Sequence, residues 1–199
     1  MAEDHHTYDG ATALLDAIWS HPLYREHAAR LAQFEADRPY CRHGIEHLLD
    51  VARIAWIENL ECDLGFSRAV IYAAALLHDI GKDEQYASRR PHEEAGAEIA
   101  ALILADVAPA MAEVESGAAE SAAPVAAGGT ASGAPVQLSP DDCAAIVRAV
   151  AEHRRCPEGS SELGRLLYRA DKASRACFAC CMRGSCSWSE EKMNLRIGV

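Results

Sequence analysis

Residues 70–77 are almost all apolar and lead directly into the pair His78-Asp79. Together with their flanks they predict a helix at about 67–79 that is buried on most of its faces and ends at Gly81, a residue type that tolerates the left-handed turn closing many helices. An unpaired ionised carboxylate costs several kcal/mol or more to bury, so buried carboxylates are normally paired or coordinate a metal. The fold must therefore bring partners to this pair, and a neutral imidazole nitrogen beside a carboxylate oxygen suits a divalent cation.

The composition favours one helical domain. The chain has 199 residues, of which 50% are hydrophobic and only 6% aromatic. The formal net charge of −11 argues against binding to a nucleic-acid polymer or an anionic membrane, because both need a basic surface. No apolar run reaches the roughly 18 residues of a membrane span, and the N-terminus lacks the features of a signal peptide, so we expect a cytoplasmic protein. Its eight cysteines are then expected to be thiols or metal ligands.

Hydrophobic periodicity predicts an all-α fold in residues 1–199. Further helices are expected at about 11–20, 23–36, 44–60, 139–154 and 162–177, with one more beginning at Pro91. Between about 108 and 137, Ala, Gly, Ser and Pro dominate, and residues such as Pro109 would interrupt a helix there. We interpret 108–137 as a flexible insertion rather than an ordered lid, because it lacks large apolar anchors.

Six ionisable residues fall on or beside the apolar stripes of five expected helices. They are His47, His78, Asp79, His92, His153 and Asp171. A single histidine on an apolar face is more often a hydrogen-bonded core residue than a ligand. For all six together, one shared metal site explains the burial more economically than several unrelated polar groups do. Imidazole and carboxylate ligands without cysteine suit a catalytic Mn, Fe, Co, Zn or Mg centre with positions left for water.

The order of these residues resembles the H…HD…D pattern of the HD-domain superfamily of metal-dependent phosphohydrolases. The strings that carry the resemblance are Glu46-His47-Leu-Leu-Asp-Val-Ala-Arg, Ala75-Leu-Leu-His-Asp-Ile-Gly-Lys82 and Leu167-Tyr-Arg-Ala-Asp-Lys172, within a match from about residue 40 to 178. The resemblance implies a helical bundle around one cation held by His47, His78, Asp79 and Asp171. His92 and His153 stand where some branches of the superfamily hold a second metal, for which Asp79 would be the bridging carboxylate.

The function implied by the resemblance is cleavage of a phosphate ester or anhydride by metal-activated water, with catalytic roles for Asp79 and Lys82. The substrate would be a nucleotide or related small metabolite, and a signalling nucleotide is one version of this. Basic residues near the expected ligands are candidates for binding it, although each could instead lie on a solvated face: Lys82, Arg42, His43, Lys172 and Arg175. The alternative is a non-catalytic metal-binding or regulatory module whose cysteine-rich tail is the interaction site. The oligomeric state stays open.

The tail at 177–188 contains four closely spaced cysteines, Cys177, Cys180, Cys181 and Cys186. Their spacing could hold a structural zinc ion or an iron–sulfur cluster. The alternative, that they are reduced cysteines acting as small hydrophobes, is favoured because no second C-x2-C pair is present. The other cysteines are scattered, and no role is predicted for Cys41, Cys62, Cys143 or Cys156.

Overall fold

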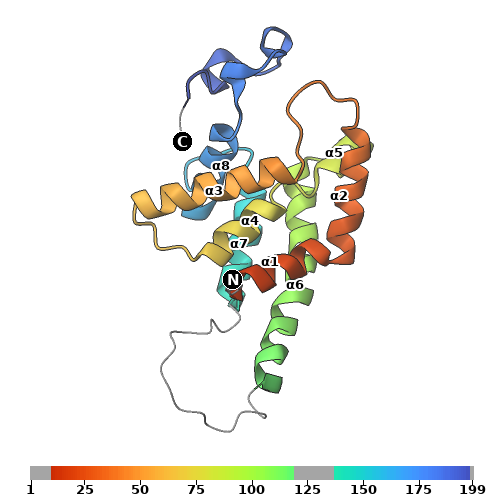
Figure 1. Cartoon of the computed structure of the whole chain (residues 1–199), viewed down its shortest axis with the longest axis vertical. Helices are drawn as coiled ribbons and strands as arrows, with labels where there is room; N and C mark the ends of the chain where they lie inside the picture. The colour runs from red at the N-terminus through yellow and green to blue at the C-terminus, as the bar shows by residue number, and fades with distance from the viewer. Residues whose placement is uncertain (1–9, 119–136, 198–199) are drawn as a thin grey trace, which may run out of the picture.

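All regular secondary structure in the described part of the chain is helical. A computed structural model describes residues 10–118 and 137–197, and it contains no strand in those ranges (Figure 1), which confirms the all-α prediction. The helices are α1 (Gly10–Ser20), α2 (Pro22–Phe34), α3 (Ile45–Glu61), α4 (Arg68–Leu77), α5 (Lys82–Ser88), α6 (His92–Ala118), α7 (Pro140–Glu152) and α8 (Glu162–Ala173). Three short 3-10 helices follow: η1 (Cys177–Ala179), η2 (Arg183–Ser185) and η3 (Glu190–Lys192).

Helix α4 is the centre of the bundle, as its apolar sequence predicts. It begins at the N-cap Ser67, whose side chain accepts a hydrogen bond from the backbone N–H of Val70. All its residues after Arg68 are buried except Tyr72, and it packs against α1, α3, α7 and α8 (Figure 1). A helix enclosed on this many sides delivers whatever follows it into the interior, and the residues that follow are His78 and Asp79.

The chain beyond α4 differs from the sequence prediction in one respect. Gly81 has φ −85° and is the N-cap of α5, so it is not the left-handed end of a helix. A Cβ at this position would lie 2.3 Å from the backbone N of Gly96 and 2.5 Å from the carbonyl O of His92. Glycine is needed because α6 passes directly against this turn, and that close approach holds the first residue of α6 beside Asp79.

The start of the expected insertion at 108 is wrong. Helix α6 continues through Pro109 to Ala118, although proline in a helix interior costs about 3 kcal/mol. The residues on either side of Pro109 are mainly strong helix formers such as alanine and methionine, which favour continuation of the helix. The rest of the predicted insertion, 119–136, lies outside the described residues. Across the described ranges, no helix is long and apolar enough to cross a membrane.

Candidate metal centre

Six buried side chains converge where several helices begin or end. His47 lies in the first turn of α3, His78 and Asp79 follow α4, His92 opens α6, His153 caps α7, and Asp171 lies in the last turn of α8. These are the six residues that the apolar stripes singled out. Because these helix ends are buried within the bundle, their side chains are positioned by helix packing.

The carboxylate of Asp79 lies between two pairs of histidines. Its Oδ2 atom is 3.1 Å from His78 Nε2 and 3.5 Å from His47 Nε2. Its Oδ1 atom is 3.5 Å from His92 Nε2 and 3.7 Å from His153 Nε2. Each oxygen thus completes a compact group with one histidine pair, in which all ligand atoms lie within 4.8 Å of one another. Asp79 is thus placed where one carboxylate could serve both histidine pairs as a ligand.

Two of the histidines are oriented by the backbone of the preceding turn. His78 Nδ1 donates to the carbonyl of Ala75 at 2.7 Å, and His153 Nδ1 donates to the carbonyl of Val150 at 2.6 Å. A carbonyl can only accept, so each contact assigns the ring proton to Nδ1. In the neutral form of each ring, the Nε2 atom carries the lone pair, and this atom faces Asp79.

Side chains orient the other two histidines in the same way. His92 Nδ1 donates to Gln85 Oε1 at 2.6 Å. His47 Nδ1 lies 3.1 Å from Ser174 Oγ, which itself donates to the carbonyl of Asp171 and therefore accepts from the imidazole. All four rings thus have a partner on Nδ1 and present Nε2 to the centre, which is how metal-binding histidines are held.

The four Nε2 atoms meet in pairs at close range, 3.3 Å apart for His47 and His78 and 3.0 Å apart for His92 and His153. Two lone pairs at such distances repel unless a proton or a cation lies between them. Burial, with the nearby charge of Lys82, lowers the pKa of His92 from 6.5 to about 2, which disfavours a proton between His92 and His153. For His47, burial is outweighed by the hydrogen bonds with Asp171 and Asp79, which raise its pKa. The donor set therefore fits a divalent cation of the kind that imidazole and carboxylate ligands select.

Both carboxylates are ionised although they are buried. Burial alone would raise the pKa of Asp79, but electrostatic interactions with the surrounding histidines, His78 first, hold it well below its usual value. The pKa of Asp171 is also held well below its usual value, because the contact with His47 and the nearby positive charges outweigh burial. Asp171 Oδ1 lies 3.4 Å from His47 Nε2, whereas its Oδ2 lies 2.5 Å from Lys172 Nζ. Asp171 therefore contacts the histidine cluster through Oδ1 and the ammonium group of Lys172 through Oδ2.

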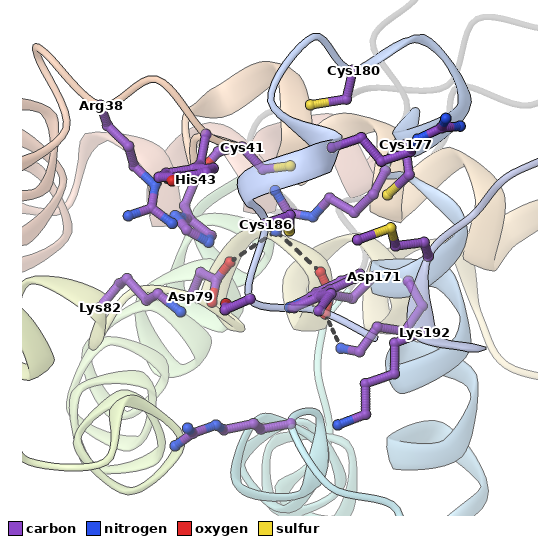
Figure 2. Close-up of a pocket in the computed structure, with 18 of the residues that line it drawn as sticks. Arg38, Cys41, His43, Asp79, Lys82, Asp171, Cys177, Cys180, Cys186 and Lys192 are labelled. Carbon is purple, nitrogen blue, oxygen red and sulfur yellow. Dashed lines mark hydrogen bonds and ion pairs between the residues drawn. The ribbon is translucent and has the colours of Figure 1, made fainter. Parts of the chain in front are cut away.

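A cavity of about 550 Å³ opens onto this centre (Figure 2). Four of the five candidate substrate-binding residues line it: Lys82, His43, Lys172 and Arg175. Arg42 does not, because its exposed guanidinium turns away to donate to the carbonyls of Ala36 and Arg38 at 3.0 and 3.3 Å. The structure thus does not bring the Arg42 side chain to the site.

Arg175 is the cation most closely joined to the ligand cluster. Its Nη2 atom lies 2.8 Å from His47 Nε2, 3.3 Å from Asp171 Oδ1 and 4.0 Å from Asp79 Oδ2. Its Nη1 atom donates to the carbonyl of Arg42 at 3.1 Å, which fixes the plane of the guanidinium. The side chain is buried, so its charge acts on the cavity without much screening by solvent.

His43 lines the cavity as a neutral group. Its pKa is lowered, above all by burial. The backbone N–H of His43 donates to Glu35 Oε2 at 2.8 Å, and its Nδ1 atom donates to Glu35 Oε1. Glu35 also accepts from Tyr86 Oη at 2.8 Å. This buried carboxylate, which the sequence did not single out, fixes the ring of His43 at the cavity wall.

Sequence reasoning missed a further set of lining residues that approach from the α2–α3 connection and from the C-terminal segment. They are Arg38, Cys41, Arg183 and Lys192. No periodic pattern marks them, because their place depends on how the C-terminal segment folds back over the cavity. Of the tail cysteines, Cys177, Cys180 and Cys186 line the cavity, whereas Cys181 is exposed and does not. Among the described residues, no three cysteine sulfurs come within 4.8 Å of one another.

Comparison with known proteins identifies relatives over most of this chain. The family model "HD domain" matches residues 44–176. An uncharacterized protein of Clostridium beijerinckii is 36% identical over 174 residues, which cover 87% of this chain and 91% of the relative. The crystal structure of a predicted HD superfamily hydrolase from an uncultured Thermotogales bacterium has a TM-score of 0.54 and 19% identity, covering 92% of this chain and 80% of that one. At such low identity the structural likeness shows the fold alone.

Proposed function

This chain belongs to the HD domain family, and on that basis we propose that it is a metal-dependent phosphohydrolase that cleaves a phosphate ester or anhydride of a nucleotide or related small metabolite. The observation that carries the proposal is the bridging position of Asp79 between two pairs of histidines whose Nε2 lone pairs all face it. A purely structural core would gain little from imidazole nitrogens that face one another, since among the four Nε2 atoms of the described structure His47 Nε2 alone has a protein donor, Arg175 Nη2 at 2.8 Å.

In this proposal His47, His78, Asp79 and Asp171 hold one divalent cation, and Asp79, His92 and His153 hold a second. When bound, a divalent cation lowers the pKa of a coordinated water and withdraws charge from a phosphoryl oxygen. Asp79 contributes the negative charge that both positions share, and the tethered imidazoles contribute a fixed geometry. The side chains therefore need little rearrangement when substrate arrives.

The cavity supplies charges suited to a small phosphorylated molecule. Lys82, Lys172 and Arg175 line it beside the histidine cluster, although the chain as a whole carries a net charge of −11. A positive pocket in a negative protein attracts a small anion and disfavours a polyanion that must also contact the outer surface. The volume of about 550 Å³ is in the range of sites that bind small molecules.

Lys82 and Arg175 have distinct positions for binding phosphate. Lys82 opens α5 three residues after Asp79, and its backbone N–H donates to the carbonyl of Asp79 at 2.9 Å, so the start of its side chain is fixed. Arg175 presents a planar, buried guanidinium against the ligand cluster, where its positive charge would attract a phosphoryl oxygen. Together they would bind the phosphoryl group from two directions and hold it next to the water.

Elemental analysis of the purified protein, combined with a phosphatase screen over nucleotides in Mn, Co, Ni and Mg, tests the proposal. We expect Asp79→Asn to lose bound metal and to lower turnover by about a thousandfold or more, because both cation positions share this carboxylate. Asp106→Asn is the matched control, since Asp106 is exposed on α6, pairs with His21 and does not line the cavity. If Asp79→Asn kept its metal and full turnover, the proposal would be wrong.

A further inference from the structure

The C-terminal segment is held in place by very little apolar packing. Within residues 177–197 the only buried side chain is Cys177, whereas Phe178 is 41% and Ile197 87% exposed. Its backbone forms three 3-10 helices joined by short turns. Segments that bury so little apolar surface usually depend on a disulfide or a metal, and the cysteines of this chain are free thiols.

Half of the chain's cysteines line the same cavity. Cys177, Cys180 and Cys186 reach it from the C-terminal segment, and Cys41 reaches it from the connection between α2 and α3. Figure 2 shows these labelled side chains together where the C-terminal segment covers the cavity, above Asp79 and Asp171. Cys181 follows Cys180 directly but is exposed and does not line the cavity, so the convergence is selective.

The local backbone favours this convergence. Cys177 and Cys180 are three residues apart around η1, and the N–H of Cys180 donates to the carbonyl of Cys177 at 3.2 Å. In a 3-10 helix, residues three apart lie on the same side, which agrees with both Cys177 and Cys180 lining the cavity. The next short helix, η2 (Arg183–Ser185), ends at Cys186 and turns the chain back toward the same cavity.

Hydrogen bonds on both sides of Cys41 join its loop to the C-terminal segment. The hydroxyl of Tyr40 donates to the carbonyl of Ser185, the residue before Cys186, at 3.3 Å. The carbonyl of Arg42 accepts from Arg175 Nη1 at 3.1 Å, two residues before Cys177. The loop is thus fastened at the two places that would align Cys41 with the other three thiols.

We propose that Cys41, Cys177, Cys180 and Cys186 are the four thiolate ligands of a metal centre that fastens the C-terminal segment over the cavity. Four cysteines are the complete ligand set of a structural zinc ion or of an iron–sulfur cluster. A tetrahedral zinc site would need the sulfurs to approach to about 3.8 Å, given Zn–S bonds of about 2.3 Å. Cys41 is exposed and Cys180 and Cys186 are half-buried, so rotation of these side chains can bring the sulfurs closer.

The charges near these thiols support a metal–thiolate centre. Zinc with four thiolates carries a net charge of −2, and a cluster with four cysteine ligands is also anionic. Arg38, Arg183 and Lys192 line the same cavity and would offset that charge. This centre differs from the histidine cluster in its ligands and in its preference for softer metals.

Metal and sulfide analysis of the full chain, purified without oxygen, tests the proposal. We expect the wild-type protein to carry either about one zinc ion that a mercurial reagent releases, or iron with an equal amount of acid-labile sulfide. The first result would identify zinc and the second a cluster. Cys41→Ser is expected to lose this metal while its helical circular-dichroism signal is kept, because Cys41 is exposed and outside the bundle core.

Two matched variants make the test specific. Cys181→Ser should keep the thiol-bound metal, because Cys181 lies next to a ligand without lining the cavity. Asp79→Asn should also keep it while losing metal from the histidine cluster, so this centre is tested separately from the proposed hydrolase. Absence of mercurial-releasable zinc and of sulfide in the wild type would overturn the proposal, and so would a Cys41→Ser protein with full metal content.

Discussion

At the scale of single residues, the orientation of each histidine ring depends on the hydrogen-bond partner of its Nδ1 atom, the ring nitrogen that faces away from Asp79. His78 and His153 use backbone carbonyls, which no substitution removes, whereas His92 uses the side chain of Gln85. These contacts orient the rings through the protein itself. Such outer partners typically change metal affinity by about 10–100-fold when they are removed.

Replacing Gln85 tests this orientation directly. Gln85→Leu removes the acceptor that lies 2.6 Å from His92 Nδ1, so the imidazole ring can rotate or change tautomer. We therefore expect the affinity for the second of two Mn²⁺ ions to fall about 10–100-fold. Gln85→Glu keeps an acceptor and should restore binding. Isothermal titration calorimetry of metal-free protein measures both, with exposed Gln33→Leu as the control. Unchanged binding by Gln85→Leu would show that the contact does not orient His92.

Glu35 gives a prediction for the dependence of stability on pH. Burial opposes its ionisation, but hydrogen bonds from His43 and Tyr86 lower its pKa from 4.5 to about 2. Because this pKa is lower in the folded protein than the unfolded value of 4.5, ionised Glu35 adds about 3 kcal/mol to the free energy of unfolding at pH values above 4.5. That contribution disappears as the pH falls toward 2. Glu35→Gln should therefore be less stable than the wild type at pH 7, and the difference should shrink through pH 4.

Denaturant unfolding at several pH values measures this difference. Glu26→Gln is the control, because Glu26 is an exposed residue of the same helix, α2, and should give a nearly constant small effect. If Glu35→Gln lowered the free energy of unfolding by the same amount from pH 7 to pH 3, the lowered pKa of Glu35 would not be the cause of the stabilisation.

At the scale of secondary-structure elements, the sequence predicts long amphipathic helices well and short polar ones poorly. Helices α3, α7 and α8 bury regular stripes, so their sequences alone reveal them. Helix α5 was missed because its seven residues have no apolar period. It is held instead by a tertiary contact, in which buried Asp83 accepts from His27 Nδ1 at 2.9 Å and from Arg30 Nε at 3.2 Å.

The close approach of α6 to the turn before α5 predicts a large effect at Gly81. Gly81→Ala would place a Cβ against backbone atoms of Gly96 and His92, which cannot move away as a flexible side chain could. We expect a loss of about 3 kcal/mol or more in unfolding free energy, with weaker metal binding because His92 is displaced. Gly184→Ala is the control, since no atom lies within 4 Å of a Cβ there. A Gly81→Ala protein as stable as the wild type would show that the packing at this turn is looser.

At the scale of the whole molecule, the cluster of histidines and aspartates could be predicted from the sequence, whereas the outer wall of the cavity could not. His47, His78, His92, His153 and Asp171 each lie on or next to an apolar stripe, so helical periodicity alone turns them inward. The outer wall contains residues such as Arg38 and Lys192, which meet only because the C-terminal segment folds back over the cavity. That segment has no periodic pattern, since it buries almost nothing, and its path depends on a few hydrogen bonds between distant parts of the chain.

Because the proposed cations join five helices, metal should stabilise the entire bundle. A ligand that binds only the folded state at about 100 times its Kd adds about 2.7 kcal/mol, which for a chain of this size raises the Tm by roughly 5–10 °C. We expect this rise when Mn²⁺ is added to chelator-treated protein and followed by differential scanning calorimetry. Asp79→Asn should abolish the rise, because its carboxylate serves both histidine pairs. Cys41→Ser should keep it, since Mn²⁺ prefers oxygen and nitrogen ligands to thiolates. An equal Tm with and without Mn²⁺ would mean that the histidine cluster does not join the helices through a metal.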